Sequence, residues 1–213
     1  MQILAPYFVN HSRSSKFPWV LYHRPIDRRI DAVVSSLPRG AEVLTVGCGL
    51  FPIPPGCRPD IRVSACDLDP RAIETCRRNY PEMESRLSVS PGAYELPPGF
   101  VGFDCVIAKE VIEHVGDPGR FFGTLAGALA PGGTLLVSTP NYGFPLTLPL
   151  LEHTVLEGVA RLDGYSRRGI HPSPQSARSM RQLRSAGVEL LSVERLALGW
   201  ALLGQWCKHG QRG

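Results

Sequence analysis

The sequence lacks a long apolar run, a Cys-x-x-Cys pair, internal repeats and low-complexity tracts. Its apolar stretch at residues 196–207 is too short to cross a bilayer. Residues 1–16 do not combine a charged start with a long apolar core, so they do not resemble a secretory signal. The six cysteines lie singly, several of them in apolar runs where a thiol packs as a small hydrophobic group. These absences predict a protein without a transmembrane segment that keeps its cysteines reduced in the cytoplasm.

Strong charge is also missing. With a formal net charge of +4 on 213 residues, the chain is too weakly basic for charge alone to indicate a nucleic-acid partner. Apolar residues, by contrast, are plentiful, and a hydrophobic content of 43% on this length can form one sizeable core. We therefore expect a single domain over residues 1–213.

Patterns typical of strands and helices alternate along the chain. Strands are predicted at residues 42–46, 61–66, 86–90, 103–108, 133–139 and 188–196, and helices at residues 24–37, from Pro70, from Pro118 and near residues 174–186. Asp69 and Asp117 precede the two prolines as capping carboxylates. This order predicts a doubly wound α/β fold, with a mostly parallel, Rossmann-like sheet and helices on both faces. Residues 197–207 fit either a last antiparallel strand or a helix, which leaves the seventh strand open.

A glycine turn follows the first predicted strand in the segment VLTVGCGLFPIP. Gly47 and Gly49 allow the main chain to bend sharply beside a ligand, and Asp67 ends the second strand, where its carboxylate can accept hydrogen bonds from ribose hydroxyls. These features suit a dinucleotide or S-adenosylmethionine. A diphosphate needs the free N–H groups of a helix start, yet prolines occupy positions 52, 54, 55 and 59. The prolines therefore favour the sulfonium cofactor.

The segment FDCVIAKEVIEHVGDPGRFFGTLAGALAPGGTLLVSTPN resembles class I S-adenosylmethionine-dependent methyltransferases, and is similar to the O-methyltransferases of ubiquinone biosynthesis. Together with VGCG and CDLDP, the resemblance covers residues 40–141. It implies methyl transfer to an oxygen, in preference to a nitrogen, of a small molecule. The cofactor-binding residues that it implies are Gly47, Cys48, Gly49, Asp67, Leu68, Ala93, Tyr94 and Lys109. Phe51 stands where the family usually has a further glycine, and Gly92 and Ala93 stand where an acidic residue often binds adenine.

The chemically active groups of the segment are Glu110, Glu113 and His114. If the chain is helical here, these side chains share one face beside the reacting methyl group. We expect His114 to act as a general base on the acceptor hydroxyl. Glu110 is expected beside it, either in catalysis or as an anchor for the amino group of the cofactor.

Two flanking segments are expected to form the acceptor side. Residues 1–39 are predicted to form a helical segment and lid, and residues 141–170 an insertion with a helix near 146–162. The residues that we expect to contact substrate are Tyr142, His171, His11 and Tyr22, with Trp19 and His23 as further lid candidates.

Two alternatives remain. Glu-x-x-Glu-His also resembles small-RNA 2'-O-methyltransferases, and a divalent metal ion would then be held by Glu110, Glu113, His114 and either His171 or His153. The insertion lacks the paired histidines of that group, so a small molecule is preferred to nucleic acid as the acceptor. The second alternative is a binding protein that keeps the fold without activity, as Phe51 and the missing adenine carboxylate suggest.

Overall fold

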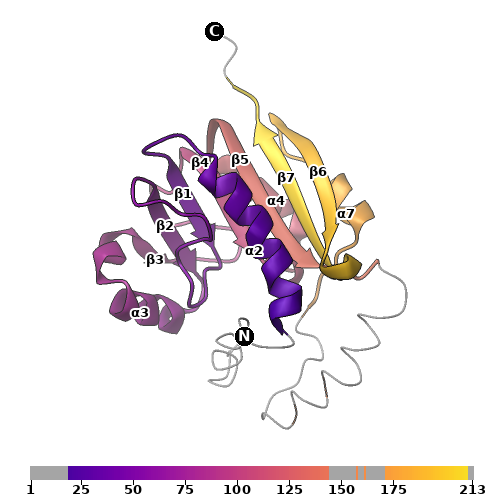
Figure 1. The fold of residues 1–213 in the computed structure, drawn as a ribbon, viewed down its shortest axis with the longest axis horizontal. Coiled ribbons are helices and arrows are strands. Elements are labelled where there is room, and N and C mark those ends of the chain that lie inside the picture. Colours follow the sequence, from indigo (N-terminus) through magenta and orange to yellow (C-terminus); the bar gives the residue numbers. More distant parts are fainter. Residues whose placement is uncertain (1–18, 144–156, 158–160, 162–170, 211–213) are drawn as a thin grey trace.

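A seven-stranded sheet forms the centre of the computed structural model (Figure 1), which describes residues 19–143, 157, 161 and 171–210. The strands are β1 (Glu42–Val46), β2 (Arg62–Asp67), β3 (Leu87–Val89), β4 (Phe103–Lys109), β5 (Leu129–Pro140), β6 (Val188–Leu196) and β7 (Ala201–Lys208). The helices are α2 (Trp19–Ser35), α3 (Pro70–Asn79), α4 (Pro118–Gly127) and α7 (Ala177–Gln182), with 3-10 turns η1 (Pro81–Arg86), η2 (Ile112–His114) and η4 (Ala197–Gly199).

The strand order is β3-β2-β1-β4-β5-β7-β6. Strands β3, β2, β1, β4 and β5 are paired in parallel, whereas β7 runs antiparallel to both of its neighbours. The order of the strands reverses between β1 and β4, and in sheets of this kind ligands bind beyond the carboxyl ends at that point. The predicted doubly wound, mostly parallel sheet is confirmed, and residues 201–208 supply the antiparallel strand that the sequence left open.

Helices cover both faces of the sheet, which the alternating strand and helix patterns predicted. Ile26 and Ile30 of α2 pack with Ile73 of α3 in one buried cluster, while Phe122 of α4 and Met180 of α7 pack in the other. Strands buried on both faces explain the nearly continuous apolar runs in β1 and β4.

Local capping sets the starts of two helices. The side chain of Asp69 accepts a hydrogen bond from the N–H of Arg71, and that of Asp117 accepts one from Arg120. Each cap is followed by a proline at the first helical position, where the missing N–H costs nothing. Both predicted caps are confirmed, although α4 ends at Gly127 and β5 already begins at Leu129.

The flanking segments lie largely outside the described residues. The first predicted helix begins earlier than expected, at Trp19, and contains Pro25. Of the predicted insertion helix near 146–162, only Glu157 and Arg161 are described; both are helical and joined by an ion pair of 2.9 Å. His11 and His153 are not described.

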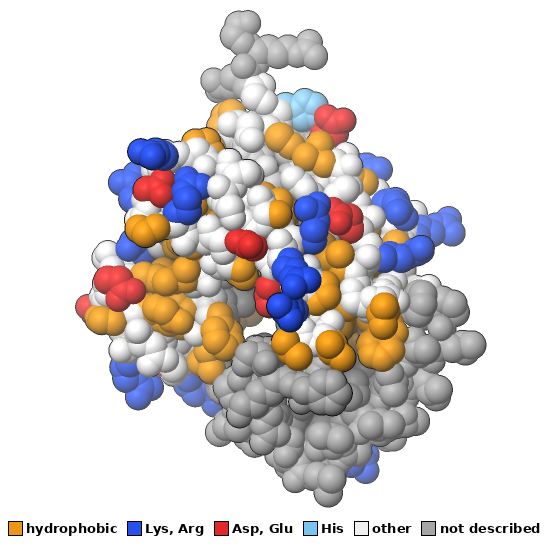
Figure 2. Space-filling view, viewed as in Figure 1, with side chains coloured by type: hydrophobic (Ala, Val, Ile, Leu, Met, Phe, Trp, Pro, Cys, Tyr) orange, Lys and Arg blue, Asp and Glu red, His pale blue; other side chains and the backbone are white. Residues whose placement is uncertain are grey.

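The face covered by α2 carries charged side chains of both signs. Lys and Arg side chains lie among Asp and Glu side chains there (Figure 2). One such pair joins α2 to β6, where Arg29 Nε donates to Glu194 at 2.9 Å. Among the described residues, no helix combines the length and apolar character that crossing a membrane requires.

Candidate active site

The predicted site residues gather at the carboxyl edge of the sheet. Gly47 follows β1, Asp67 ends β2, Lys109 ends β4, and Tyr142 lies two residues after β5. These four strands are neighbours in the sheet. Segments far apart in the sequence therefore meet beside the point where the strand order reverses.

Glu110 takes a left-handed backbone conformation immediately after β4. Its φ is 57°, and its N–H donates to the carbonyl oxygen of Ser138 at 3.1 Å. Its carboxylate accepts hydrogen bonds from the hydroxyls of Tyr22 at 2.7 Å and Ser138 at 2.8 Å. Burial raises the pKa of Glu110 despite these two bonds, and burial together with the nearby Glu110 raises the pKa of Tyr22.

The condition that the chain is helical through residues 110–114 is not met. The positive φ of Glu110 ends the strand, and only the 3-10 turn η2 follows. Because a left-handed residue precedes this short turn, Glu110 and His114 do not share a helix face. Glu110 contacts Tyr22 and Ser138, while His114 lies with a different set of side chains.

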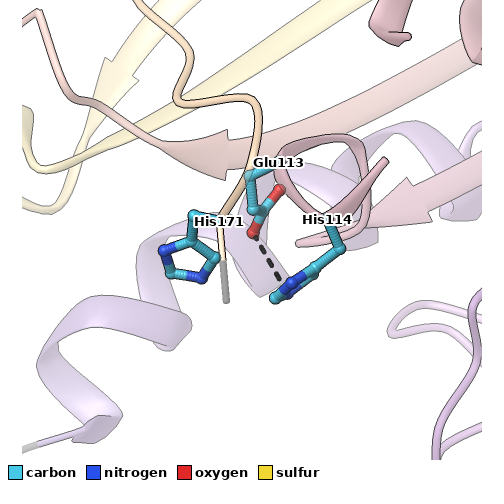
Figure 3. A group of neighbouring side chains, drawn as sticks. All are labelled: Glu113, His114 and His171. Atoms are coloured by element: carbon cyan, nitrogen blue, oxygen red, sulfur yellow. Dashed lines mark ion pairs between the residues drawn. The ribbon is translucent and has the colours of Figure 1, made fainter. Parts of the chain in front are cut away.

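That set consists of Glu113, His114 and His171, drawn in Figure 3. One potential ligand atom from each residue lies within 4.8 Å of the other two. Glu113 is 1% exposed, and its Oε1 lies 4.0 Å from His114 Nε2. The rings of His114 and His171 have centroids 4.8 Å apart. The hydroxyl of Tyr142 forms a hydrogen bond with Nδ1 of His171.

A main-chain contact joins the two segments of this cluster. The N–H of Ser173 donates to the carbonyl oxygen of Glu113 at 3.1 Å. This bond fixes the chain after the insertion against η2, so His171 stays beside His114. Two imidazoles and a buried carboxylate can accept a proton from an acceptor or hold a divalent cation. Glu110, the fourth member of the predicted metal set, is not part of this group.

Backbone conformation and lack of space both require glycine in the turn after β1. Gly47 and Gly49 have φ values of 66° and 53°, which side chains disfavour. A Cβ added to Gly47 would lie 2.6 Å from Cγ2 of Val111. The N–H groups of Gly47 and Cys48 donate to the carbonyl oxygen of Cys66 at 2.8 and 3.1 Å, which ties the turn to β2.

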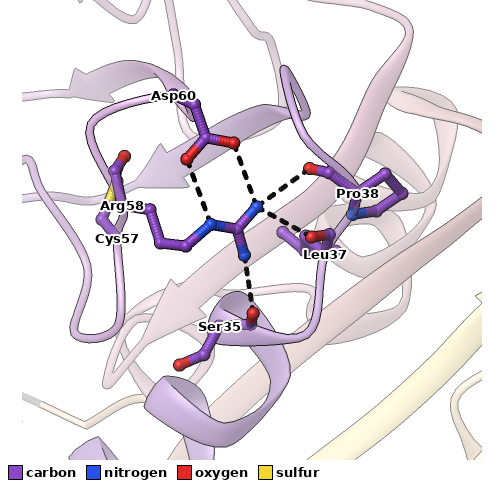
Figure 4. Close-up of polar contacts among 6 residues, drawn as sticks. All are labelled: Ser35, Leu37, Pro38, Cys57, Arg58 and Asp60. Atoms are coloured by element: carbon purple, nitrogen blue, oxygen red, sulfur yellow. Dashed lines mark hydrogen bonds and ion pairs between the residues drawn. The ribbon is translucent and has the colours of Figure 1, made fainter.

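The chain after this turn forms no helix before β2, and every residue from 47 to 61 is described. We call residues 51–60 the proline loop. Arg58 anchors it to the end of α2, because its guanidinium donates to the carbonyl oxygens of Ser35 at 2.6 Å and Leu37 at 2.9 Å (Figure 4). The same guanidinium also bonds Asp60 and the carbonyl oxygen of Pro38. With no helix start above the glycines, the turn offers no N-terminal dipole for a diphosphate.

Asp67 already holds two main-chain groups. Its Oδ2 accepts from the N–H of Gly49 at 2.8 Å, and its Oδ1 accepts from the N–H of Asp69 at 2.9 Å. Burial raises the pKa of Asp67, while these N–H groups lower it. A carboxylate has about four acceptor positions, so both oxygens retain capacity for ribose hydroxyls. Leu68, beside it, is 52% exposed and offers an apolar surface for a base.

Two other predicted cofactor residues have partners within the chain. Lys109 Nζ lies 2.5 Å from Oδ1 of Asp27 in α2, so its charge is compensated. The hydroxyl of Tyr94 accepts the N–H of Asp117 at 2.9 Å, and Arg120 lies 4.7 Å above its ring.

The remaining predicted positions are placed as follows. Ala93 packs against the core cluster of α4, and His23 lies edge-on to Tyr22. Sequence reasoning missed Ser138 and Asp27. Ser138 could have been noticed as a polar residue near the end of the buried segment LLVSTPN. Asp27 lies among other charged residues of α2, and nothing in the sequence distinguishes it from them.

Comparison with known proteins identifies the family of the chain. A family model described as a methyltransferase domain matches residues 20–193. The chain belongs to this family. The predicted membership of the S-adenosylmethionine-dependent methyltransferases is thereby confirmed.

The methyltransferase is similar to curated ubiquinone biosynthesis O-methyltransferases. It is 37% identical to that of Caulobacter sp. (strain K31) over 105 residues, which cover 48% of this chain and 42% of the relative. It is also 37% identical to that of Xanthomonas campestris pv. campestris (strain B100) over 121 residues, or 53% of this chain and 49% of the relative. The matches thus span less than half the length of these relatives.

Solved structures share the fold of the methyltransferase. The N-methyltransferase NodS from Bradyrhizobium japonicum WM9, solved with S-adenosyl-L-homocysteine, has a TM-score of 0.61 at 17% identity. That match covers 94% of this chain and 96% of NodS. The CurJ carbon methyltransferase has a TM-score of 0.65 at 16% identity and covers 95% of this chain. At such identity the likeness concerns the fold alone.

Proposed function

We propose that the methyltransferase transfers a methyl group from S-adenosylmethionine to an oxygen of a small molecule. The observation that carries the proposal is the convergence of the Gly47 turn, Asp67 and the His114 cluster at one sheet edge. The fold does not determine the acceptor atom, since solved proteins with this fold include an N-methyltransferase and a carbon methyltransferase. The ubiquinone O-methyltransferases at 37% identity support oxygen.

The chain would hold the cofactor at the first half of the edge. The two left-handed glycines bring bare main chain to the crevice, the carboxylate of Asp67 suits ribose, and exposed Leu68 suits the adenine face. The bound cofactor supplies a methyl group on a positively charged sulfur. The carboxyl group of Glu110, held by the hydroxyls of Tyr22 and Ser138, would accept a hydrogen bond from the ammonium group of the cofactor.

The chain would act on the acceptor at the second half of the edge. His114 would take the proton from the acceptor hydroxyl, while the cofactor would supply the methyl group and its sulfur would keep the electron pair of the broken carbon–sulfur bond. Buried Glu113, with Oε1 4.0 Å from His114 Nε2, favours the imidazolium that results. Tyr142 orients His171 through Nδ1, and both would line the acceptor pocket with Tyr22.

The test is methyl uptake by a panel of phenolic, carboxylic and RNA acceptors with labelled cofactor. His114→Ala should lower kcat by about 100-fold or more and leave affinity for S-adenosylhomocysteine within about twofold. His209→Ala is the matched control, because His209 is exposed and follows β7 at the opposite edge of the sheet. Wild-type turnover in His114→Ala would remove this histidine from the chemistry. Absence of binding heat with either cofactor form would instead favour the inactive binding protein.

A second candidate is metal-assisted methyl transfer at the same cluster. Its supporting observation is that ligand atoms of Glu113, His114 and His171 lie within 4.8 Å of one another. Mixed carboxylate and imidazole ligands suit Zn²⁺ or Mn²⁺. An ion there would bind the acceptor oxygen and lower the pKa of the acceptor hydroxyl, so His114 would not be needed as a base.

Chelation separates the two candidates. If His114 is the base, turnover after dialysis against EDTA should equal that of the untreated methyltransferase. If an ion is required, turnover should vanish and return with Zn²⁺ or Mn²⁺, and Mn²⁺ binding followed by electron paramagnetic resonance should be lost in His171→Ala.

A further inference from the structure

Two cysteines from different elements meet beneath the glycine turn. Cys48 lies between Gly47 and Gly49, and Cys76 lies on α3. Both thiols approach one acceptor, since Sγ of Cys76 lies 3.3 Å and Sγ of Cys48 lies 3.8 Å from the carbonyl oxygen of Gly49. All six cysteines of the chain are free thiols.

The environment distinguishes this pair from the other cysteines. Hydrogen bonding between the two thiols lowers the pKa of Cys76 and raises that of Cys48. Burial raises the pKa of Cys66 to about 11 and that of Cys105 to about 12, so these two are poor nucleophiles. Cys76 is 0% and Cys48 is 6% exposed. The proposal therefore requires a small oxidant to enter at the glycine turn, on the side of Cys48.

We propose that Cys48 and Cys76 are a modification site, which a hydroperoxide converts to a disulfide that closes the cofactor site. The Cys76 thiolate attacks one peroxide oxygen, the O–O bond breaks, and a sulfenic acid forms with loss of the other oxygen as water or an alcohol. The sulfur of Cys48 then displaces the sulfenic hydroxyl as water, which forms the S–S bond. The two thiols lose two electrons and two protons, and the peroxide gains them.

The consequence follows from the geometry of the turn. Gly47 and Gly49 are held in left-handed conformations, and the N–H of Gly49 donates to Asp67. A bond from Cys48 to Cys76 pulls the residue between these glycines toward α3. Since the ribose carboxylate and the turn are joined, both move, and the affinity for cofactor falls. The predicted loss of affinity rests on the proposed function, whereas the disulfide can form even if S-adenosylmethionine is not the ligand of this site.

The experiment is peptide mapping after treatment of the full chain with hydrogen peroxide. Trypsin releases Cys76 in residues 72–77 and Cys66 in residues 63–71, while Cys48 and Cys57 share residues 40–62 because Pro59 protects Arg58 from cleavage. In a Cys57→Ala background, a link between residues 72–77 and 40–62 identifies the predicted bond. Prior addition of S-adenosylhomocysteine should slow its formation.

Binding calorimetry measures the effect on the site. Oxidation should weaken S-adenosylhomocysteine binding by about tenfold or more, and dithiothreitol should restore it. Cys76→Ala should resist this loss, with Cys48→Ala as a second resistant variant. Cys207→Ser is the matched control, because Cys207 is a partly exposed thiol that pairs with Thr134 at the other end of β5. Absence of the linked peptide, or equal loss of affinity in oxidised Cys76→Ala, overturns the proposal.

Discussion

Replacement of Gly47 by alanine tests whether the cofactor turn is built as described. At a φ of 66°, a side chain costs about 1–2 kcal/mol. The new Cβ would also lie 2.6 Å from Cγ2 of Val111, an overpacking that costs about 1–3 kcal/mol. We therefore expect Gly47→Ala to lower the free energy of unfolding by about 2–5 kcal/mol, the sum of these two effects.

Gly40 separates the two contributions. It has a φ of 75°, but a Cβ there would meet nothing within 4 Å. Gly40→Ala thus reports the backbone cost alone, and the loss of unfolded-chain entropy on replacing glycine is common to both variants. The difference between the variants, measured by urea denaturation, is the contact with Val111.

A double-mutant cycle completes the test. Val111→Ala removes both Cγ atoms that approach the new Cβ. In the Gly47→Ala background it should therefore recover the stability that Gly47→Ala loses beyond the loss in Gly40→Ala. Calorimetry should show S-adenosylhomocysteine binding weakened in Gly47→Ala and unchanged in Gly40→Ala. If both glycine variants lose equal stability, the close approach of Val111 to the turn is refuted.

Three further predictions concern the supports of the site. Asp69→Ala should lower the free energy of unfolding, measured by urea denaturation, by about 1 kcal/mol, because it removes the cap of α3. The hydrogen bond with Arg71 lowers the pKa of Asp69. The stabilisation by this carboxylate is therefore present above about pH 4 and is lost as the pH falls through the folded-state pKa. Tyr22→Phe should cost about 1 kcal/mol through the lost hydrogen bond to Glu110, and unchanged stability would contradict that contact. Arg58→Ala should speed amide exchange in the proline loop without loss of the fold, and unchanged exchange would show that this guanidinium is not its anchor.

The strands were predicted well because the pattern that defines them is local. The segments EVLTV and VELLSVERL became β1 and β6 with the expected bounds. The last strand could not be assigned because β7 lies between β5 and β6, with most of its residues buried. A strand buried on both faces loses the alternation that distinguishes it from a buried helix.

For the proposed acceptor side, the sequence predicted which residues take part but not how they are arranged. The sequence indicated Glu110, Glu113 and His114 as the chemically active groups and His171 as a substrate contact, but their arrangement depends on distant partners. Ser138 on β5 binds both the N–H and the carboxylate of Glu110, and the left-handed φ at that position stands in place of the expected helix. The spacing of residues 110–114 cannot indicate a hydrogen bond that Ser138 forms from another strand.

This difference separates the residues proposed to hold the cofactor from those proposed to contact the acceptor. The Gly47 turn and Asp67 belong to adjacent strands, and the N–H of Gly49 within the turn donates directly to Asp67, so the half of the edge proposed for the cofactor is held together by neighbouring elements. The acceptor half needs His114 from η2 and His171 from the chain after the insertion, held together by the bond from Ser173 to Glu113. Under the proposed function we therefore expect a change at His171 to alter acceptor preference while the glycine turn and the core strands stay as they are.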